Sequence, residues 1–115
     1  MRCTLRYAPP EVVNAFIEDT HVAVHPSVDV WALGVMAFEV LSGRHTVQSR
    51  GELYAFAAGT QPYPWEAAPD TAREPWRKLR LWALVEDCLA RDPATRPSAA
   101  TVVQRLEQTW QKTSI

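Results

Sequence analysis

The stretch from Pro26 to Gly43, PSVDVWALGVMAFEVLSG, decides the fold of this chain. It predicts one helix, because Ser27 is a good N-cap, Asp29 places a carboxylate in the first turn, and Gly43 is a natural terminator. Apart from Asp29 and Glu39 the stretch is uncharged, so apolar side chains cover every face. Its sixteen inner residues rise only about 24 Å, and a membrane span needs ~20 uninterrupted apolar residues. We therefore expect a core helix.

One shorter helix is expected on each side of this stretch. The first begins at the double proline Pro9-Pro10 and ends near Asp19. The second covers 49–59, where Ser49 and Glu52 have the spacing of a capping box. Residues 60–75 contain four prolines, which predicts a loop without regular structure. Its expected anchors in the core are Tyr63 and Trp65.

Residues 76–115 show helical spacing twice, interrupted at Asp92-Pro93. The apolar face of the first helix is expected to comprise Leu81, Leu84, Val85, Cys88 and Leu89. That of the second is expected to comprise Ala99, Val102, Val103, Leu106 and Trp110. No strand-like alternation occurs anywhere, so the sequence predicts an all-α chain with long irregular loops.

Composition indicates one ordinary globular domain at most, with 115 residues, 47% of them apolar and 22% charged. The net charge of -1 gives no long-range attraction to nucleic acid or to an acidic membrane. One basic cluster, with Trp76 and Trp82 close by, is interpreted as a solvated helix face; it comprises Arg73, Arg77, Lys78 and Arg80. We therefore expect neither nucleic acid nor a membrane as a partner.

The cysteines and histidines give no metal or disulfide pattern. Cys3 and Cys88 are isolated thiols, and no apolar signal segment follows Met1, so we expect an intracellular, cytoplasmic protein. His21 and His25 are four residues apart, a spacing that can hold a metal on a helix. Because Pro26 follows and no third ligand is evident, surface loop histidines are the favoured interpretation, without a metal site.

Three motifs occur in a fixed order along nearly the whole chain: TLRYAPPE at 4–11, DVWALGV at 29–35 and RDPATRPS at 91–98. They resemble the end of the activation segment, the central helix and the turn into the last helix of eukaryotic-type serine/threonine protein kinase domains. The resemblance implies a partial kinase domain, the C-terminal part of the large lobe. Its parts would be the substrate loop at 1–11, the central helix at 26–43, a short helix at 49–59, a proline-rich loop at 60–75 and the last two helices at 76–115.

The resemblance also implies roles for individual residues. Thr4 matches the threonine that contacts the catalytic loop in Ser/Thr-directed kinases. The residues that would bind the protein substrate, next to the acceptor hydroxyl, are Thr4, Leu5, Arg6, Tyr7 and Ala8. Glu11 and Arg96 would form an ion pair, which a bidentate guanidinium suits well. Asp29 would anchor the catalytic loop, which lies outside this chain.

Two positions depart from the family's form. Cys3 replaces a glycine, which could change how the segment turns, and Pro9 replaces an alanine, which stiffens the backbone. Neither change threatens the fold assignment.

The chain lacks the family's nucleotide motifs. Its four glycines are scattered, no His-Arg-Asp or Asp-Phe-Gly occurs, and the only lysines are Lys78 and Lys112. The resemblance therefore implies no catalytic, cofactor-binding or metal-binding residue here. ATP and Mg²⁺ are expected for the full-length family domain, at a site upstream of Met1.

Two hypotheses for function remain open. In the first, the chain supplies the substrate platform and lobe core of a Ser/Thr kinase, whose missing N-terminal half performs ATP-dependent phosphoryl transfer to protein Ser/Thr. In the second, it is a non-catalytic, truncated kinase-like module that binds partners or substrates. Coding sequence before Met1 distinguishes them, because an in-frame Asp-Phe-Gly and His-Arg-Asp would make Met1 an internal start or a gene-model error.

Overall fold

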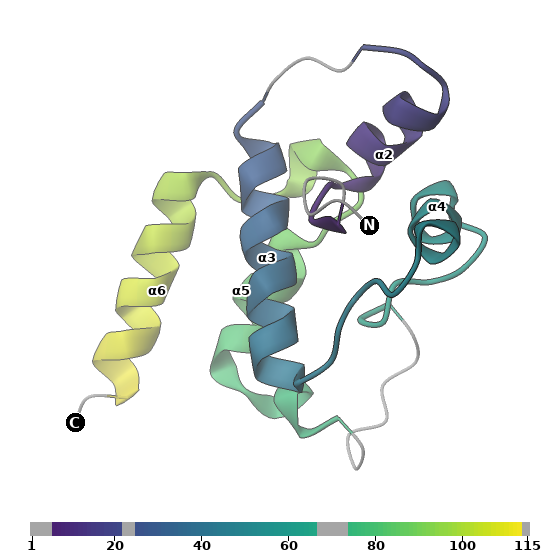
Figure 1. Ribbon diagram of the computed structural model, residues 1–115. Coiled ribbons are helices and arrows are strands. Elements are labelled where there is room, and N and C mark those ends of the chain that lie inside the picture. The colour runs from purple at the N-terminus through teal and green to yellow at the C-terminus, as the bar shows by residue number, and fades with distance from the viewer. Residues whose placement is uncertain (1–5, 22–24, 67–73, 114–115) are drawn as a thin grey trace.

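The computed structural model describes residues 6–21, 25–66 and 74–113, and Figure 1 shows their arrangement. The described residues contain helices and no strand, which confirms the all-α prediction. The α-helices are α2 (Pro10–Ile17), α3 (Ser27–Ser42), α4 (Arg50–Ala58), α5 (Arg80–Cys88) and α6 (Ala99–Thr113). Two short 3₁₀ helices, η1 (Pro75–Lys78) and η2 (Pro93–Thr95), lie before α5 and before α6. Within this described part, no helix has the length and apolar character to cross a membrane.

Helix α3 stands in the middle of the molecule, with α6 on one side and α2 and α4 on the other (Figure 1). Its side chains Trp31, Val35 and Phe38 are almost completely buried. Phe38 lies 5.1 Å from both Trp65 and Trp76, measured between ring centroids. Trp31 lies 5.2 Å from Tyr63, so the two predicted anchors, Tyr63 and Trp65, are in the core. An aromatic cluster around α3 therefore fixes the irregular segment after α4.

The other face of α3 is exposed, so this core helix is buried on one side only. Leu33, Met36 and Val40 are 46%, 46% and 82% exposed. They lie three and four residues apart, so they share one face of the helix. Asp29, in the first turn, lies on the same face and is also exposed. We call Leu33, Met36 and Val40 the α3 stripe.

The ends of α3 differ slightly from the prediction. The N-cap is Pro26, so Ser27 is the first helical residue. The Ser27 N–H donates to His25 Nδ1 at 3.1 Å, and its hydroxyl lies 2.9 Å from the same nitrogen. An imidazole thus satisfies one of the N–H groups that a helix leaves free in its first turn. At the other end Gly43 is left-handed, with φ of 69°, as a helix-terminating glycine should be.

Helices α2 and α4 pack against each other. The Asn14 amide on α2 donates to the Ala57 carbonyl on α4 at 3.0 Å. At the start of α4 the Ser49 hydroxyl accepts the Glu52 N–H at 3.2 Å, as the capping box predicts. The Glu52 carboxylate accepts the N–H of Gln48, one residue earlier than the standard box has it, at 2.9 Å.

Helix α5 packs on α3, and α6 packs on α5. The predicted apolar face of α5 is buried except for the half-buried Leu81. That of α6 is only partly covered: Val102 is buried, whereas Val103 and Leu106 are 55% and 40% exposed. Ala99 is exposed as well, and the side chain of Trp110 lies outside the described part. The α6 prediction was therefore wrong for most of its stripe, because only the beginning of the helix meets a neighbour's core residues.

The basic cluster is only partly a solvated face. Arg73 lies outside the described residues, and Lys78 and Arg80 are exposed as expected. Arg77 is different, because its side chain is only 9% exposed and its Nε donates to Glu74 at 2.6 Å. Its guanidinium also stacks 4.6 Å from the ring centroid of Trp76. Arg77 therefore packs against the aromatic core instead of facing water.

Candidate functional site

The candidate site is the segment that leads into α2. Thr4 and Leu5 lie outside the described residues, and the description begins at Arg6. Ala8 is buried, whereas Arg6 and Tyr7 are half-buried beside α3. The two prolines that follow cannot donate backbone hydrogen bonds, so side chains must hold this segment to the rest of the molecule.

Glu39 on α3 receives this segment. Its carboxylate accepts hydrogen bonds from Arg6 Nη2 at 3.0 Å and from the Tyr7 hydroxyl at 3.2 Å. It also accepts the Thr46 N–H, at 2.9 Å, from the loop after α3. Arg6 Nη2 additionally contacts Nδ1 of His45 in that loop. One carboxylate therefore joins the α3 helix, the candidate substrate loop and the α3–α4 loop.

The electrostatics of Glu39 favour its ionised form. Burial raises the pKa of this carboxyl, but the Thr46 N–H, Arg6 and the Tyr7 hydroxyl together outweigh burial. The net result is a pKa below the ordinary value. Hydrogen bonds to a carboxylate lower its pKa in this way because they are lost when the group is protonated. Glu39 is thus an anion that organises the site.

The far end of the segment is held by Glu11, the second residue of α2. Arg96 Nη1 lies 2.7 Å from Glu11 Oε2, and Arg96 Nη2 lies 2.8 Å from Oε1. This is the bidentate geometry of a strong guanidinium–carboxylate pair. The structure therefore brings together two residues that are 85 positions apart in the chain.

Arg96 is the best-connected side chain of the site. It is fully buried, whereas Glu11 is 23% exposed. Arg96 also donates to the carbonyls of Ala90, Arg91 and Ser27, and its guanidinium lies 5.0 Å from the Trp31 ring centroid. This single cation therefore joins the starts of α2 and α3 to the turn that precedes α6.

Asp29 is expected to contact the catalytic loop, which is not part of this chain. It is exposed in the first turn of α3, on the face of the α3 stripe. A carboxylate there interacts favourably with the helix dipole. Besides the loop held by Glu39 and Glu11, the structure thus presents an exposed row on α3 that contains Asp29 and the α3 stripe.

Sequence reasoning did not identify Glu39 as part of the site. One signal was available, because Glu39 and Asp29 are the only charges in an otherwise apolar helix. A carboxylate in such a helix requires partners, and the nearby basic residues were the candidates. Which of them it would meet depends on the tertiary fold.

Comparison with known proteins identifies the class. Residues 1–108 match the family model of the protein kinase domain. The chain is 30% identical over 107 residues to human (Homo sapiens) mitogen-activated protein kinase kinase kinase 11, a match that covers 90% of this chain and 11% of that protein. It is 31% identical over 106 residues to serine/threonine-protein kinase A of Synechocystis sp., covering 89% of the chain and 18% of that protein. A Wee1-like protein kinase of Arabidopsis thaliana is 30% identical over 94 residues, covering 82% and 16%.

The chain therefore belongs to the protein kinase domain family. It spans between 11% and 18% of the lengths of these three relatives.

Membership of this family implies ATP and Mg²⁺ for the full-length domain. No group of three or more His, Cys, Asp or Glu side chains is placed to hold a metal ion in the described ranges. Lys78 is exposed on η1, and a kinase lysine needs a phosphate site beside it.

Proposed function

We propose that this chain is the C-terminal part of a Ser/Thr protein kinase domain and supplies the platform on which the protein substrate lies. The observation that carries the proposal is the attachment of the segment at both ends, by Glu39 at Arg6 and Tyr7 and by Arg96 at Glu11. A segment held in this way has little freedom left to lose when a substrate peptide binds. The expected substrate-binding residues are Thr4, Leu5, Arg6, Tyr7 and Ala8.

The phosphoryl transfer itself belongs to the rest of the domain. ATP with Mg²⁺ supplies the phosphoryl group in this family, and catalysis there consists of positioning and charge stabilisation. We propose that the N-terminal half of the domain covers the face that contains Asp29 and the α3 stripe. Exposed apolar side chains at regular helical spacing indicate such a covered face.

The same face supports the second candidate function. A module without catalysis could bind a partner protein through Leu33, Met36 and Val40. The platform is favoured because the Glu39 and Arg96 contacts hold the loop segment at both ends, and a partner interface on the α3 stripe does not require this attachment. Ser/Thr specificity follows only from Thr4.

Nuclear magnetic resonance of the ¹⁵N-labelled chain tests the platform. We expect peptides with one Ser or Thr to shift the resonances of residues 4–8, with an affinity that depends on the residue after the acceptor. Glu39→Gln should weaken binding, because it loosens Arg6 and Tyr7. The matched control, Glu86→Gln, removes one exposed carboxylate of α5 and should leave binding unchanged. Shifts confined to the α3 stripe would instead support the partner-binding module.

A further inference from the structure

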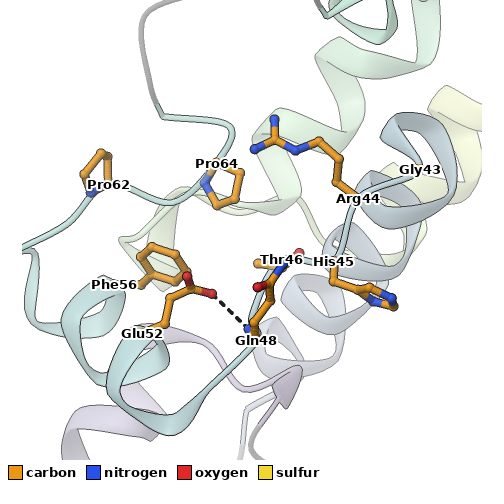
Figure 2. Close-up of a pocket in the computed structure, with 9 residues that line it drawn as sticks. All are labelled: Gly43, Arg44, His45, Thr46, Gln48, Glu52, Phe56, Pro62 and Pro64. Carbon is orange, nitrogen blue, oxygen red and sulfur yellow. Dashed lines mark hydrogen bonds between the residues drawn. The ribbon is translucent and has the colours of Figure 1, made fainter.

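A pocket of about 490 Å³ opens between the α3–α4 loop and the segment after α4 (Figure 2). Phe56, Pro62 and Pro64 lie along one side, and Arg44 and Gln48 lie along the other. Ligand sites typically have volumes of about 300–1,000 Å³. The pocket is therefore large enough for one side chain and the backbone on either side of it.

Of the charged groups around this pocket, Arg44 is the one available to a ligand. The Glu52 carboxylate caps the start of α4 through the Gln48 N–H, as the dashed line in Figure 2 shows. The Arg44 side chain is 52% exposed and has one hydrogen bond within the described residues, 3.4 Å long, to Glu74. Arg77 binds the same Glu74 more closely, at 2.6 Å. Since a guanidinium has five N–H donors, Arg44 keeps most of its capacity.

The pocket is connected to the candidate substrate loop. Thr46 forms part of its wall and donates its N–H to Glu39, which also holds Arg6 and Tyr7. A protein segment that lies on the substrate loop can therefore continue past Glu39 into the pocket.

We propose that this pocket docks a segment of the protein substrate that carries an acidic side chain. Arg44 binds the carboxylate, and the apolar part of the segment lies on Phe56, Pro62 and Pro64. A basic side chain in this place would meet the Arg44 cation, and like charges repel at such a distance. The proposal rests on the proposed function, because the segment is taken to belong to the substrate.

Fluorescence anisotropy with labelled Ser-containing peptides tests the site. The peptides are identical except for Asp or Asn at one scanned position. At one position Asp should bind about two- to fivefold more tightly than Asn, the gain of a half-exposed ion pair. Arg44→Gln should abolish this preference, Arg44→Lys should keep part of it, and Arg44→Glu should reverse it, so that Asn binds more tightly than Asp.

Arg50→Gln is the matched control, since Arg50 is exposed on α4 and does not line the pocket. It should leave the preference for Asp intact. No Asp preference at any position, or an equal loss in the Arg50 and Arg44 variants, would overturn the proposal. Circular dichroism verifies that the Arg44 variants keep their helix content.

A peptide that carries Asp but neither Ser nor Thr distinguishes a failure of the docking site from a failure of the proposed substrate platform. Arg44-dependent binding of such a peptide, without shifts at residues 4–8 for any peptide, would support the docking site and contradict the platform. Binding at residues 4–8 that ignores Arg44 would support the platform and overturn the docking site. Failure of every peptide to bind would overturn both.

Discussion

At the scale of single residues, two charged side chains hold the candidate site together. Glu39 accepts hydrogen bonds from Arg6 in the candidate substrate loop and from Thr46 in the α3–α4 loop. Arg96 instead binds Glu11, near the other end of the chain. The Arg6–Glu39 and Arg96–Glu11 ion pairs do not lie on the open surface. Each is therefore expected to contribute more to stability than the ~0–1 kcal/mol that exposed pairs contribute.

Arg96→Ala should strongly destabilise the chain. Its loss leaves Glu11 unpaired and three carbonyls without their donor, and removing one partner of a buried pair costs about 3–5 kcal/mol. Chemical denaturation at a fixed protein concentration measures the cost. The double variant with Glu11→Gln should cost clearly less than the sum of the two single changes. The control, Arg105→Ala, breaks the exposed pair with Asp87 and should cost less than about 1 kcal/mol.

The lowered pKa of Glu39 predicts how the stability of the chain depends on pH. Its folded-state pKa lies below the ordinary value of 4.5, so the unfolded chain binds this proton more readily than the folded chain. The contribution of Glu39 is therefore present above pH 4.5 and is lost as the pH falls through the lower folded-state value. Thermal unfolding between pH 3 and pH 7 should show a shallower acid decline for Glu39→Gln than for the original chain. The same decline in both proteins would contradict the assignment.

At this scale, the sequence predicted a contact only between residues that occupy motifs of the family. Glu11 and Arg96 each occupy a motif of the family, so their proximity was expected before any coordinates. Glu39 occupies none of the quoted motifs, and its partners Arg6 and Thr46 come from two segments that only the fold brings together. Arg77 was misjudged for a similar reason, because spacing alone does not show which side of a basic helix is covered by tryptophans.

At the scale of elements, α3 organises the molecule through its two different faces. Its buried face carries Gly34, where an added Cβ would lie 3.0 Å from the Cβ of Cys88 and from two side-chain atoms of Leu89. Helices α3 and α5 are therefore in close contact at this glycine. Burial here also raises the pKa of the Cys88 thiol to about 11, so this cysteine is an inert part of the core.

Gly34→Ala should destabilise the chain although alanine is the better helix former. The Cys88 Cβ cannot move without its backbone, and overpacking a core contact costs about 1–3 kcal/mol. Gly51→Ala is the matched control, because no atom lies within 4 Å of its added Cβ and α4 gains helix propensity. It should stabilise by roughly 0.5–1 kcal/mol. Denaturation midpoints that rise for both variants would contradict the close packing of α3 on α5.

The ends of helices could be predicted where they depend on a residue that acts only on its neighbours in the sequence. Gly43, Gly59 and the Ser49 cap act on their own neighbours, and the structure shows each in its expected role. Helix α3 begins at Ser27 instead of being capped by its side chain, because the N–H groups of Val28 and Asp29 donate to the carbonyls of His25 and Pro26. Periodicity placed α6 but did not show which part of it would be covered, since that depends on the position of α5.

At the scale of the whole molecule, the chain is less compact than its length suggests. Its radius of gyration is 14.6 Å, with extents of 51 × 33 × 22 Å, whereas a compact domain of this length has about 13 Å. Helix α6 stands to one side of α3 in Figure 1, and the α3 stripe is exposed.

The isolated chain should therefore self-associate. Leu33, Met36 and Val40 form an exposed apolar row on the central helix, and such patches are covered in stable proteins. Analytical ultracentrifugation should show association that the triple change to serine reduces. A monomer with a sharp two-state thermal transition at low micromolar concentration would contradict this expectation.

We propose that this member of the kinase family positions the protein substrate, whereas the rest of the domain holds the nucleotide. Isothermal titration of ATP with Mg²⁺ into the chain, beside titration of a Ser-containing peptide, tests it most directly. We predict heat of binding for the peptide and no saturable binding of the nucleotide, because no group of three or more His, Cys, Asp or Glu in the described ranges is placed to hold a metal ion and the four glycines of the sequence form no glycine-rich phosphate loop. Saturable nucleotide binding in the micromolar range would contradict the account.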